Sequence, residues 1–342
     1  MGKDQKPLGV GKLPIHVLRE KVLGMTGKVS KDLVTPPKAG LDFAAIRVGR
    51  RFMVVSADPI TGVASQIGEY AIKVSANDVA TSGNRPQFAE SVVLLPEGSS
   101  SDDVELVVGQ MDRAAKQLGI AIVGGHTEVS PGLRRPIVSV TAFSFVKEYV
   151  SSEDAREGDS IMMTKTAGLE GTAVLATEGT GLRGRIPAAT LARARKFMDS
   201  MSIVEEAAVA YGTGAVHAMH DCTEGGVLGA VFEMSLASGI GFTLNERAIP
   251  VAPETKAICS RYSIDPLRLL GSGSLLMAIE HGKETKVASA LAPVCKATII
   301  GHFRKGRRTM TNRDGTERLI RDAPRDELWR VLADSSRRSK RP

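Results

Sequence analysis

The sequence predicts a protein of the α+β or α/β class with two domains. Three observations support this prediction. The chain has 342 residues, more than one ordinary hydrophobic core accommodates. Strand and helix patterns alternate along it in two successive series. A charged segment that contains Gly158 separates the two series. We therefore place an N-terminal domain at 36–150 and a C-terminal domain at 151–303, preceded by an arm, 1–35, and followed by a basic tail, 304–342.

The first series of elements follows from its caps and stop signals. Pro59 is expected to end the first strand, because proline restricts the residue before it and lacks a backbone donor. Gly83 is a left-handed stop after the first long helix, and Ser100 with Asp103 forms a capping box that opens the next one. The expected elements are a short helix within 15–23, strand 52–57, helix 67–80, strand 90–95, a helix from Ser100 to Leu118-Gly119, and strands 120–123 and 137–146.

The second series repeats the alternation of strands and helices. Its expected elements are strand 160–164, helices 170–177 and 188–211, strand 215–219, helix 227–238, strands 241–244 and 275–280, helix 284–291 and strand 297–303. In the tail, Asp314-Gly315 predicts a hairpin over 310–320. A short helix over 326–332 contains Trp329, the only tryptophan. The last eight residues, from Ser335, are expected to be disordered.

Charge and composition exclude several classes of function. The net charge is +7, and because the tail carries 13 basic and six acidic residues, the preceding 303 residues balance at 32 of each sign. A nucleic-acid-binding body is therefore not expected. No apolar run is long enough for a membrane span and no signal peptide is evident, so a cytoplasmic location is expected. Cys222, Cys259 and Cys295 form no CxxC pair, which argues against a zinc ribbon, a redox motif or a disulfide framework.

Carboxylates at the ends of two elements are the first candidates for chemistry. Asp58 follows the first strand, and Asn77 and Asp78 lie late on the helix after it. Mg²⁺ prefers oxygen ligands of this kind, often one or two carboxylates together with phosphate oxygens. The alternative is that Asp58 caps a turn and Asp78 caps a helix end on the surface.

A first glycine pair follows the apolar strand 120–123, in the run Gly124-Gly125-His126-Thr127. Two glycines allow a backbone to approach a ligand closely, and their exposed N–H groups can hold a phosphate. The alternative is a tight turn with a surface histidine.

A second glycine pair has the same design, in the run Asp221-Cys222-Thr223-Glu224-Gly225-Gly226. It leads into a helix whose N-terminal N–H groups and dipole favour an anion such as phosphate. The alternative is a helix that starts at glycine because it packs closely against a sheet. Cys222 is expected to be a buried packing residue, since no histidine is placed to activate it.

Taken together, the motifs resemble those of the PurM-like superfamily, in the same order and from about residue 9 to residue 303. They are Ser56-Ala57-Asp58, Asn77-Asp78-Val79-Ala80, Gly124-Gly125-His126-Thr127, Gly168-Leu169-Glu170-Gly171-Thr172, Asp221-Cys222-Thr223-Glu224-Gly225-Gly226 and Gly271-Ser272-Gly273-Ser274-Leu275-Leu276. The superfamily includes aminoimidazole ribonucleotide (AIR) synthetase, selenophosphate synthetase, thiamine-monophosphate kinase and the hydrogenase maturation factor HypE.

The resemblance implies a subunit that forms a homodimer through the sheet of its N-terminal domain and binds ATP between its domains. Members use Mg²⁺ and ATP to phosphorylate a substrate oxygen, often that of an amide-type carbonyl. Lys12, in the arm, could close over the phosphates or remain a solvated loop lysine. The implied metal ligands are Asp42, Asp58 and Asp78, the implied catalytic residues are Asp58, Asp78 and His126, and the implied nucleotide, phosphate or substrate contacts are Lys12, Asn77, Gly124, Gly125, Thr127, Asp221, Thr223, Gly225 and Gly226.

Within the superfamily, the stretches 168–172 and 271–276 look most like those of HypE. HypE proteins end in a cysteine that accepts a carbamoyl group, whereas no cysteine follows Cys295 here. They also usually have an acidic residue at the position of His126 and a lysine at that of Glu128. We therefore expect an ATP-dependent enzyme of HypE-like shape with an unassigned small-molecule or protein-bound substrate. The alternative is a non-catalytic nucleotide-binding dimer, a scaffold or regulatory protein whose tail binds polyanions.

Overall fold

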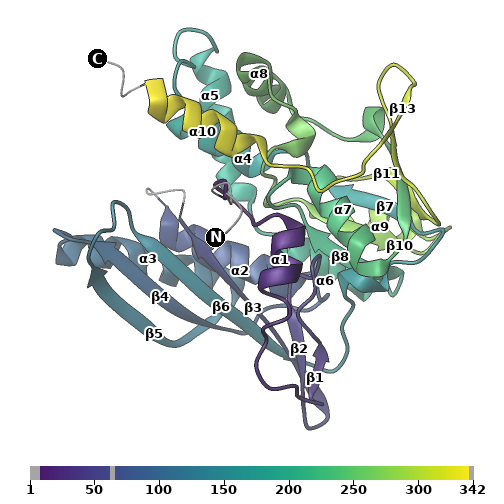
Figure 1. Ribbon diagram of the computed structural model, residues 1–342, viewed down its shortest axis with the longest axis horizontal. Coiled ribbons are helices and arrows are strands. Elements are labelled where there is room, and N and C mark those ends of the chain that lie inside the picture. Colours follow the sequence, from purple (N-terminus) through teal and green to yellow (C-terminus); the bar gives the residue numbers. More distant parts are fainter. Residues whose placement is uncertain (1–7, 62–65, 339–342) are drawn as a thin grey trace, which may run out of the picture.

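The computed structural model describes residues 8–61 and 66–338 (Figure 1). Each half of the chain forms one mixed β-sheet with helices packed against it, so the predicted two-domain α+β class is confirmed. Among the described residues, no helix is both long and apolar enough to cross a membrane.

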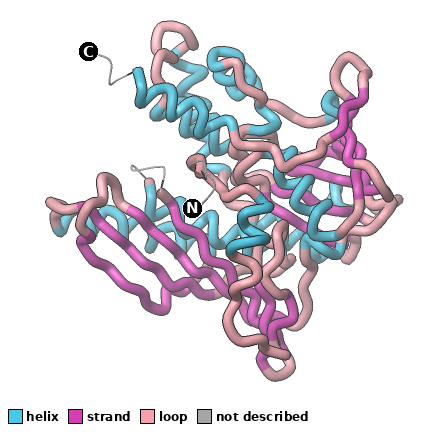
Figure 2. Tube along the Cα trace, viewed as in Figure 1, coloured by secondary structure: helices cyan, strands magenta, loops and turns pink. Residues whose placement is uncertain are grey.

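The N-terminal half forms a six-stranded sheet in the order β1-β2-β3-β6-β4-β5. Its strands are β1 (Leu33–Thr35), β2 (Ala44–Val48), β3 (Arg51–Ile60), β4 (Phe88–Pro96), β5 (Ala121–Ser130) and β6 (Ile137–Val146). Helices α2 (Ile67–Ala80) and α3 (Ser101–Leu118) lie on one side of this sheet (Figure 2). Along β6, every second residue from Val138 to Val146 is buried, while the residues between them are partly exposed. The other face of the sheet is open.

Local signals predict both helices of this domain correctly. Helix α2 ends at Ala80, as expected. The Ser100 side chain accepts a hydrogen bond from the backbone N–H of Asp103, and the Asp103 carboxylate accepts one from the N–H of Ser100 at 2.8 Å. Gly119 closes α3 in the left-handed conformation. The capping box and the glycine stop therefore act as the sequence predicts.

Two expected strand ends are wrong. Strand β3 runs through Pro59 to Ile60, because its pairing with β2 stops at Val55 and the proline nitrogen then faces no neighbouring strand. Strand β5 does not turn at Gly124 but continues to Ser130, because β4 pairs with it along that whole length.

The C-terminal half forms a seven-stranded sheet in the order β13-β12-β9-β11-β7-β10-β8. Its strands are β7 (Ser160–Thr164), β8 (Val216–Asp221), β9 (Gly241–Asn245), β10 (Leu275–Ile279), β11 (Ala297–Arg304), β12 (Arg308–Thr311) and β13 (Glu317–Leu319). The helices are α4 (Leu169–Glu178), α5 (Ala188–Arg195), α6 (Val204–Gly212), α7 (Gly226–Ser238), α8 (Pro253–Tyr262), α9 (Glu284–Leu291) and α10 (Glu327–Arg338), with α1 (Ile15–Lys21) in the N-terminal arm. Short 3₁₀ turns are η1 (Ser152–Asp154), η2 (Lys196–Ser200), η3 (Glu246–Ala248) and η4 (Pro266–Arg268).

The long helix expected over 188–211 is instead divided into α5, η2 and α6. The break follows from a contact with the other domain. Asn77 Nδ2 donates to the backbone oxygen of Met201 at 2.8 Å, and the N–H of Ile203 donates to Asn77 Oδ1 at 2.9 Å. These backbone groups are therefore bonded to α2 rather than to neighbouring turns of a helix.

The segment predicted to be a basic tail is integrated into the C-terminal domain. Strand β12 pairs in parallel with β9, and the predicted hairpin with β13 is confirmed. Helix α10 buries Leu328 and Val331 in a cluster with Ile258 and Leu269. The helix extends to Arg338, so the disorder expected from Ser335 is wrong for 335–338, and the rest of that prediction lies outside the described residues.

A shared hydrophobic core joins the two domains. Ile72 and Ala76 of α2 belong to the same buried cluster as Val204 of α6 and Met219 of β8. Burial of apolar surface from both halves holds the end of β8 against α2. This packing determines which polar residues meet between the domains.

Candidate active site

Carboxylates from five separate segments gather where the two domains join. They are Asp42 in the loop before β2, Asp58 in β3, Asp78 in α2, Asp221 at the end of β8 and Glu233 in α7, and we call them the carboxylate cluster. In Figure 1 the elements that carry them lie around the junction of the two sheets. The predicted acidic residues of both domains are thus brought together.

Asp58 and Asp78 form a pair within the cluster. The Ser56 hydroxyl donates to Asp78 Oδ2 at 2.7 Å, and the Asp58 carboxyl is hydrogen-bonded to that of Asp78. Burial, and then the charge of Asp58, raises the pKa of Asp78 well above its ordinary value. Burial also raises the pKa of Asp58. Two carboxyl groups so close share a proton when no cation is present.

His220 lies among the carboxylates from both domains. Its Nε2 is 3.1 Å from Asp42 Oδ1 and 3.3 Å from Glu233 Oε2, and its Nδ1–H donates to the backbone oxygen of Asp221 at 2.7 Å. Burial works to lower the pKa of His220, but Asp42 and Glu233 outweigh it and raise the pKa to about 9. Burial works in turn to raise the pKa of Glu233, but Lys12 and His220 hold it at about 2.

Several ligand atoms of the cluster are buried and have no hydrogen-bond partner within the part of the chain that the structure describes. They are Asp42 Oδ2, both carboxylate oxygens of Asp221, and His220 Nε2. Burial, followed by the charge of Asp42, raises the pKa of Asp221 to about 8, and burial raises that of Asp42 to about 6. Leaving such groups unpaired costs about 1–3 kcal/mol each. A divalent cation fits this donor set, because carboxylate oxygens are its ordinary ligands.

The N-terminal arm crosses the cluster and places Lys12 at its edge. The Lys12 N–H donates to Glu224 Oε2 at 2.7 Å, and its Nζ donates to Thr223 Oγ1 at 3.1 Å and to Glu233 Oε2 at 3.4 Å. Loss of water works to lower the pKa of Lys12, but the nearby carboxylates, led by Glu233 and Asp221, outweigh it and raise the pKa. The Lys12 side chain as a whole remains 51% exposed, so it lies at the solvent edge of the cluster.

Two family models match the chain. The N-terminal domain of AIR synthase related proteins matches residues 40–146, and the C-terminal domain of the same proteins matches residues 156–311. The chain belongs to this family. The resemblance to PurM-like proteins predicted from the motifs is confirmed.

Named relatives of this AIR synthase-related protein include hydrogenase maturation proteins. It is 29% identical to a putative hydrogenase expression/formation protein of Methanocaldococcus jannaschii, over 83% of this chain and 85% of the relative. It is 29% identical to the carbamoyl dehydratase HypE of Escherichia coli, over 73% of this chain and 74% of HypE. A crystal structure of HypE in complex with ATP matches with a TM-score of 0.70 at 22% identity, over 94% of this chain and 98% of that one. These relatives thus include an enzyme, a carbamoyl dehydratase, and a HypE protein with ATP bound.

The second glycine pair of this family member begins α7 beside the cluster. The N–H of Gly225 donates to Asp326 Oδ2 at 2.8 Å, so a carboxylate from the segment before α10 lies at this helix N-terminus. Gly226 has a φ of +62°, and a Cβ there would lie 2.6 Å from the backbone oxygen of Leu267. Close packing therefore requires glycine at this position. Cys222 is fully buried and burial raises its pKa, which confirms the expected packing role.

The first glycine pair is not brought to the cluster within one chain. Gly124, Gly125, His126 and Thr127 lie in β5, the edge strand, and strands β4 and β6 stand between β5 and β3. The His126 side chain is 63% exposed, and its Nε2 lies 3.0 Å from Glu128 Oε2. The expected phosphate-binding turn is therefore an exposed strand.

Asn77 also differs from its expected place. It was predicted as a phosphate or substrate contact, but it is fully buried and both polar atoms of its amide bond to the backbone of Met201 and Ile203. These bonds hold α2 against the C-terminal domain. The residue thus supports the site by fixing the position of Asp78, its neighbour on α2.

Three polar residues near the site lie outside the predicted set, of which His220 and Glu170 are buried and Glu233 is partly buried. His220 directly precedes Asp221, which is the signal that could have found it. Glu233 lies seven residues after Gly226, two helical turns along the same face. Glu170 lies in the first turn of α4, and burial raises its pKa to about 7. Glu170 belongs to the motif Gly168-Leu169-Glu170-Gly171-Thr172, whereas His220 and Glu233 belong to no familiar sequence pattern.

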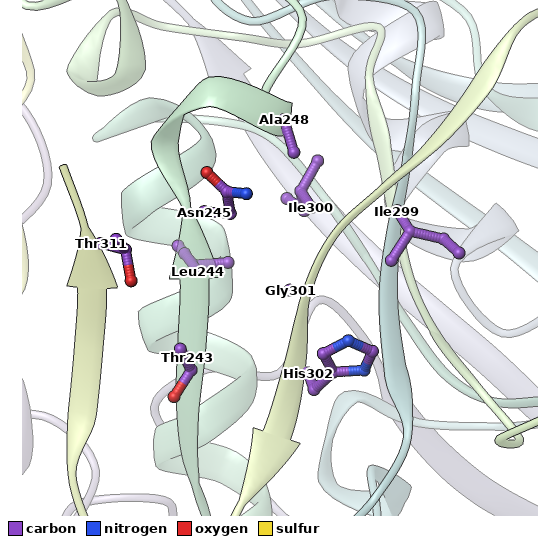
Figure 3. A pocket seen from close by; sticks show the side chains of 9 residues that line it. All are labelled: Thr243, Leu244, Asn245, Ala248, Ile299, Ile300, Gly301, His302 and Thr311. Atoms are coloured by element: carbon purple, nitrogen blue, oxygen red, sulfur yellow. The ribbon is translucent and has the colours of Figure 1, made fainter. Parts of the chain in front are cut away.

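A pocket of about 320 Å³ lies elsewhere in the C-terminal domain, on strands β9, β11 and β12 (Figure 3). Thr243, Asn245 and His302 are among its lining residues. None of the predicted site residues lines it, so it is separate from the candidate active site.

Proposed function

We propose that this protein is an enzyme that uses ATP and Mg²⁺ to phosphorylate an amide- or carbonyl-type oxygen of a small molecule or a protein-bound group. The observation that carries the proposal is the set of buried, unpaired carboxylate oxygens between the domains, with Lys12 at its edge. The relatives support ATP as the phosphoryl donor, since they include a carbamoyl dehydratase and a HypE with bound ATP.

The residues of the cluster divide between cation and phosphate binding. Asp42, Asp58, Asp78 and Asp221 supply the oxygens that would hold divalent cations, and Mg²⁺ neutralises phosphate charge when bound. Lys12 would exchange its contacts with the cluster for phosphate oxygens, and its place on the arm allows that movement. Phosphoryl transfer depends on positioning and charge neutralisation, so this set is sufficient without a covalent nucleophile.

Calorimetry of ATP binding to the full chain, with and without Mg²⁺, tests the site. Asp58→Asn and Asp78→Asn are each expected to weaken Mg²⁺-dependent ATP binding by about tenfold or more, because each removes a charged ligand. Asp112→Asn is a matched control, since Asp112 is exposed on α3 and pairs with Lys116. Unchanged binding in both site variants would contradict the assignment. ATP binding without phosphate release in the presence of amide acceptors would favour a non-catalytic nucleotide-binding protein instead.

We also propose that the protein is a homodimer that pairs through the open face of the N-terminal sheet. Phe88, Phe143 and Phe145 contact one another there and remain partly exposed. The neighbouring edge strand β5 exposes Val123 at 57%. An apolar sheet face and an unpaired edge both favour association with another copy. We propose that in this dimer β5 of one copy approaches the site of the other.

Light scattering with size-exclusion chromatography tests the dimer. Val123→Lys places a charge on the exposed edge and is expected to shift the protein towards the monomer. Leu106→Lys is the matched control, because Leu106 is 56% exposed on α3, away from the open face. A wild-type monomer, or equal effects of the two variants, would contradict the proposed interface.

A further inference from the structure

His220 supplies a nitrogen donor among the oxygen donors of the carboxylate cluster. Within residues 8–61 and 66–338, Asp42, His220 and Asp221 are the one group of potential metal-binding side chains whose ligand atoms all lie within 4.8 Å of one another. The side chains of His220 and Asp221 are at most 2% exposed, and that of Asp42 is 7% exposed. The group is therefore enclosed by the two domains.

The imidazole ring is oriented in the manner of a metal ligand. Its Nδ1–H donates to the backbone oxygen of Asp221, which fixes the ring and directs Nε2 towards Asp42 and Glu233. A hydrogen bond from the other ring nitrogen to a carbonyl is the usual support of a metal-binding histidine. Nε2 itself is buried and has no hydrogen-bond partner of acceptable geometry.

The distances around Nε2 match those between neighbouring ligands of one ion. Nε2 lies 3.1 Å from Asp42 Oδ1 and 3.3 Å from Glu233 Oε2. Ligands at about 2.1 Å from a metal are about 3.0 Å apart on adjacent corners of an octahedron and about 3.4 Å apart in a tetrahedron. Nε2 and Asp42 Oδ1 are thus spaced as two ligands of one ion, and Asp221 completes a group whose ligand atoms all lie within 4.8 Å of one another.

We propose that His220 is a metal ligand, and that the ion held by His220, Asp42 and Asp221 is a first-row transition metal such as Mn²⁺ or Co²⁺ rather than Mg²⁺. Mg²⁺ prefers oxygen ligands and keeps several waters, whereas imidazole is a good ligand for transition metals. The Asp58 and Asp78 pair remains an all-oxygen position suited to Mg²⁺. This inference rests on the metal-binding part of the proposed function and does not depend on which acceptor is phosphorylated.

A purely structural imidazolium between Asp42 and Glu233 would use the same contacts. The two roles differ in their effect on metal choice. A structural ion pair supports every bound metal equally, through the shape of the site. A ligand contributes its nitrogen to the bound ion and distinguishes Mn²⁺ from Mg²⁺.

Pulsed electron paramagnetic resonance of Mn²⁺ bound to the metal-stripped full-length protein tests the ligand directly. The wild type is expected to show a ¹⁴N coupling from imidazole, and His220→Asn is expected to lose it. His220→Asn is also expected to weaken Mn²⁺ binding about tenfold or more, and Mg²⁺ binding, measured by competition, by less than about threefold.

His217→Asn is the matched control, because His217 lies on the same strand and pairs with Asp159 at 2.9 Å, outside the cluster. It is expected to keep both the ¹⁴N coupling and the Mn²⁺ affinity. Absence of the coupling in the wild type would overturn the proposal whether or not His220→Asn folds, as would an equal loss of Mn²⁺ and Mg²⁺ binding in that variant. If the wild type binds Mg²⁺ and ATP but shows no ¹⁴N coupling, the proposed function stands and this inference fails. If it binds neither metal, both fail.

Discussion

The two glycine pairs of this chain follow apolar strands in the same way, yet they end in different structures. Gly225-Gly226 begins helix α7 at the carboxylate cluster, whereas Gly124-Gly125 lies inside strand β5 at an exposed edge. The difference comes from their neighbours. Gly226 packs against the backbone of Leu267, while β4 offers hydrogen-bond partners along the whole of β5. Glycine allows either structure, and the adjoining elements select one.

Alanine at Gly226 and alanine at Gly124 are expected to show the largest contrast. Gly226→Ala forces a left-handed φ of +62° on a residue whose Cβ would lie 2.6 Å from the Leu267 oxygen. The free energy of unfolding should fall by about 2–4 kcal/mol. A Cβ at Gly124 would have no neighbouring atom within 4 Å. Gly124→Ala should therefore change the free energy of unfolding by less than about 0.5 kcal/mol. Urea denaturation measures both, and similar losses would show that Gly124 is as constrained as Gly226.

The pH dependence of the free energy of unfolding is expected to come from the buried carboxylate cluster and not from the exposed strand β5. Asp221 has a pKa of about 8 in the folded protein, above the ordinary 3.8, so the folded state holds its proton more tightly than the unfolded state. Without metal, its contribution to stability is full below about pH 4 and is lost as the pH rises towards 8. Between pH 5 and 7, titration of Asp221 lowers the free energy of unfolding by at most about 1.4 kcal/mol per pH unit.

Asp221→Asn should flatten that slope, and so should saturating Mg²⁺, because the bound cation favours the ionised carboxylate. Chemical denaturation at several pH values, without metal, provides the measurement. His126→Ala on β5 is the control and should leave the slope unchanged, since His126 is 63% exposed. A slope that Asp221→Asn does not alter would mean that other groups control the pH dependence.

The smallest expected effect is the contribution of the edge strand β5 to ATP affinity. If β5 contributes to the site of a second copy, His126→Ala should weaken ATP binding about threefold in the dimer, the loss of one exposed polar contact. In the Val123→Lys background the same change should have no effect on ATP affinity. Calorimetry on both backgrounds would sharpen the comparison, and equal effects in dimer and monomer would show that β5 acts within its own chain.

Elements defined by local signals agree with the sequence prediction. Helix α3 begins and ends where Ser100, Asp103 and Gly119 place it, since a capping box and a left-handed glycine act within one turn. The break after α5 has no such signal. It depends on Asn77, more than a hundred residues away, which takes up the backbone groups of 201–203. Long-range hydrogen bonds of this kind override a helical pattern.

Some residues of the candidate site can likewise be predicted from local sequence signals, and others cannot. Asp58, Asp78 and Asp221 stand out in the sequence because each lies near the end of an element beside a motif. His220 and Glu233 do not, because neither belongs to a recognisable spacing. These two residues can be assigned to the site only once the positions of β8 and α7 relative to α2 are known.

The sequence by itself determined the two-domain α+β class, most helix and strand positions, and the resemblance to PurM-like proteins. These properties depend on hydrophobic periodicity, caps and short motifs, which act locally. Only the tertiary structure decided that the carboxylates meet around His220 and Lys12, and that the first glycine pair stays apart in β5. The physical reason is the apolar core shared by both domains, with Ile72 and Met219 in one cluster, which sets the place of side chains far apart in the chain.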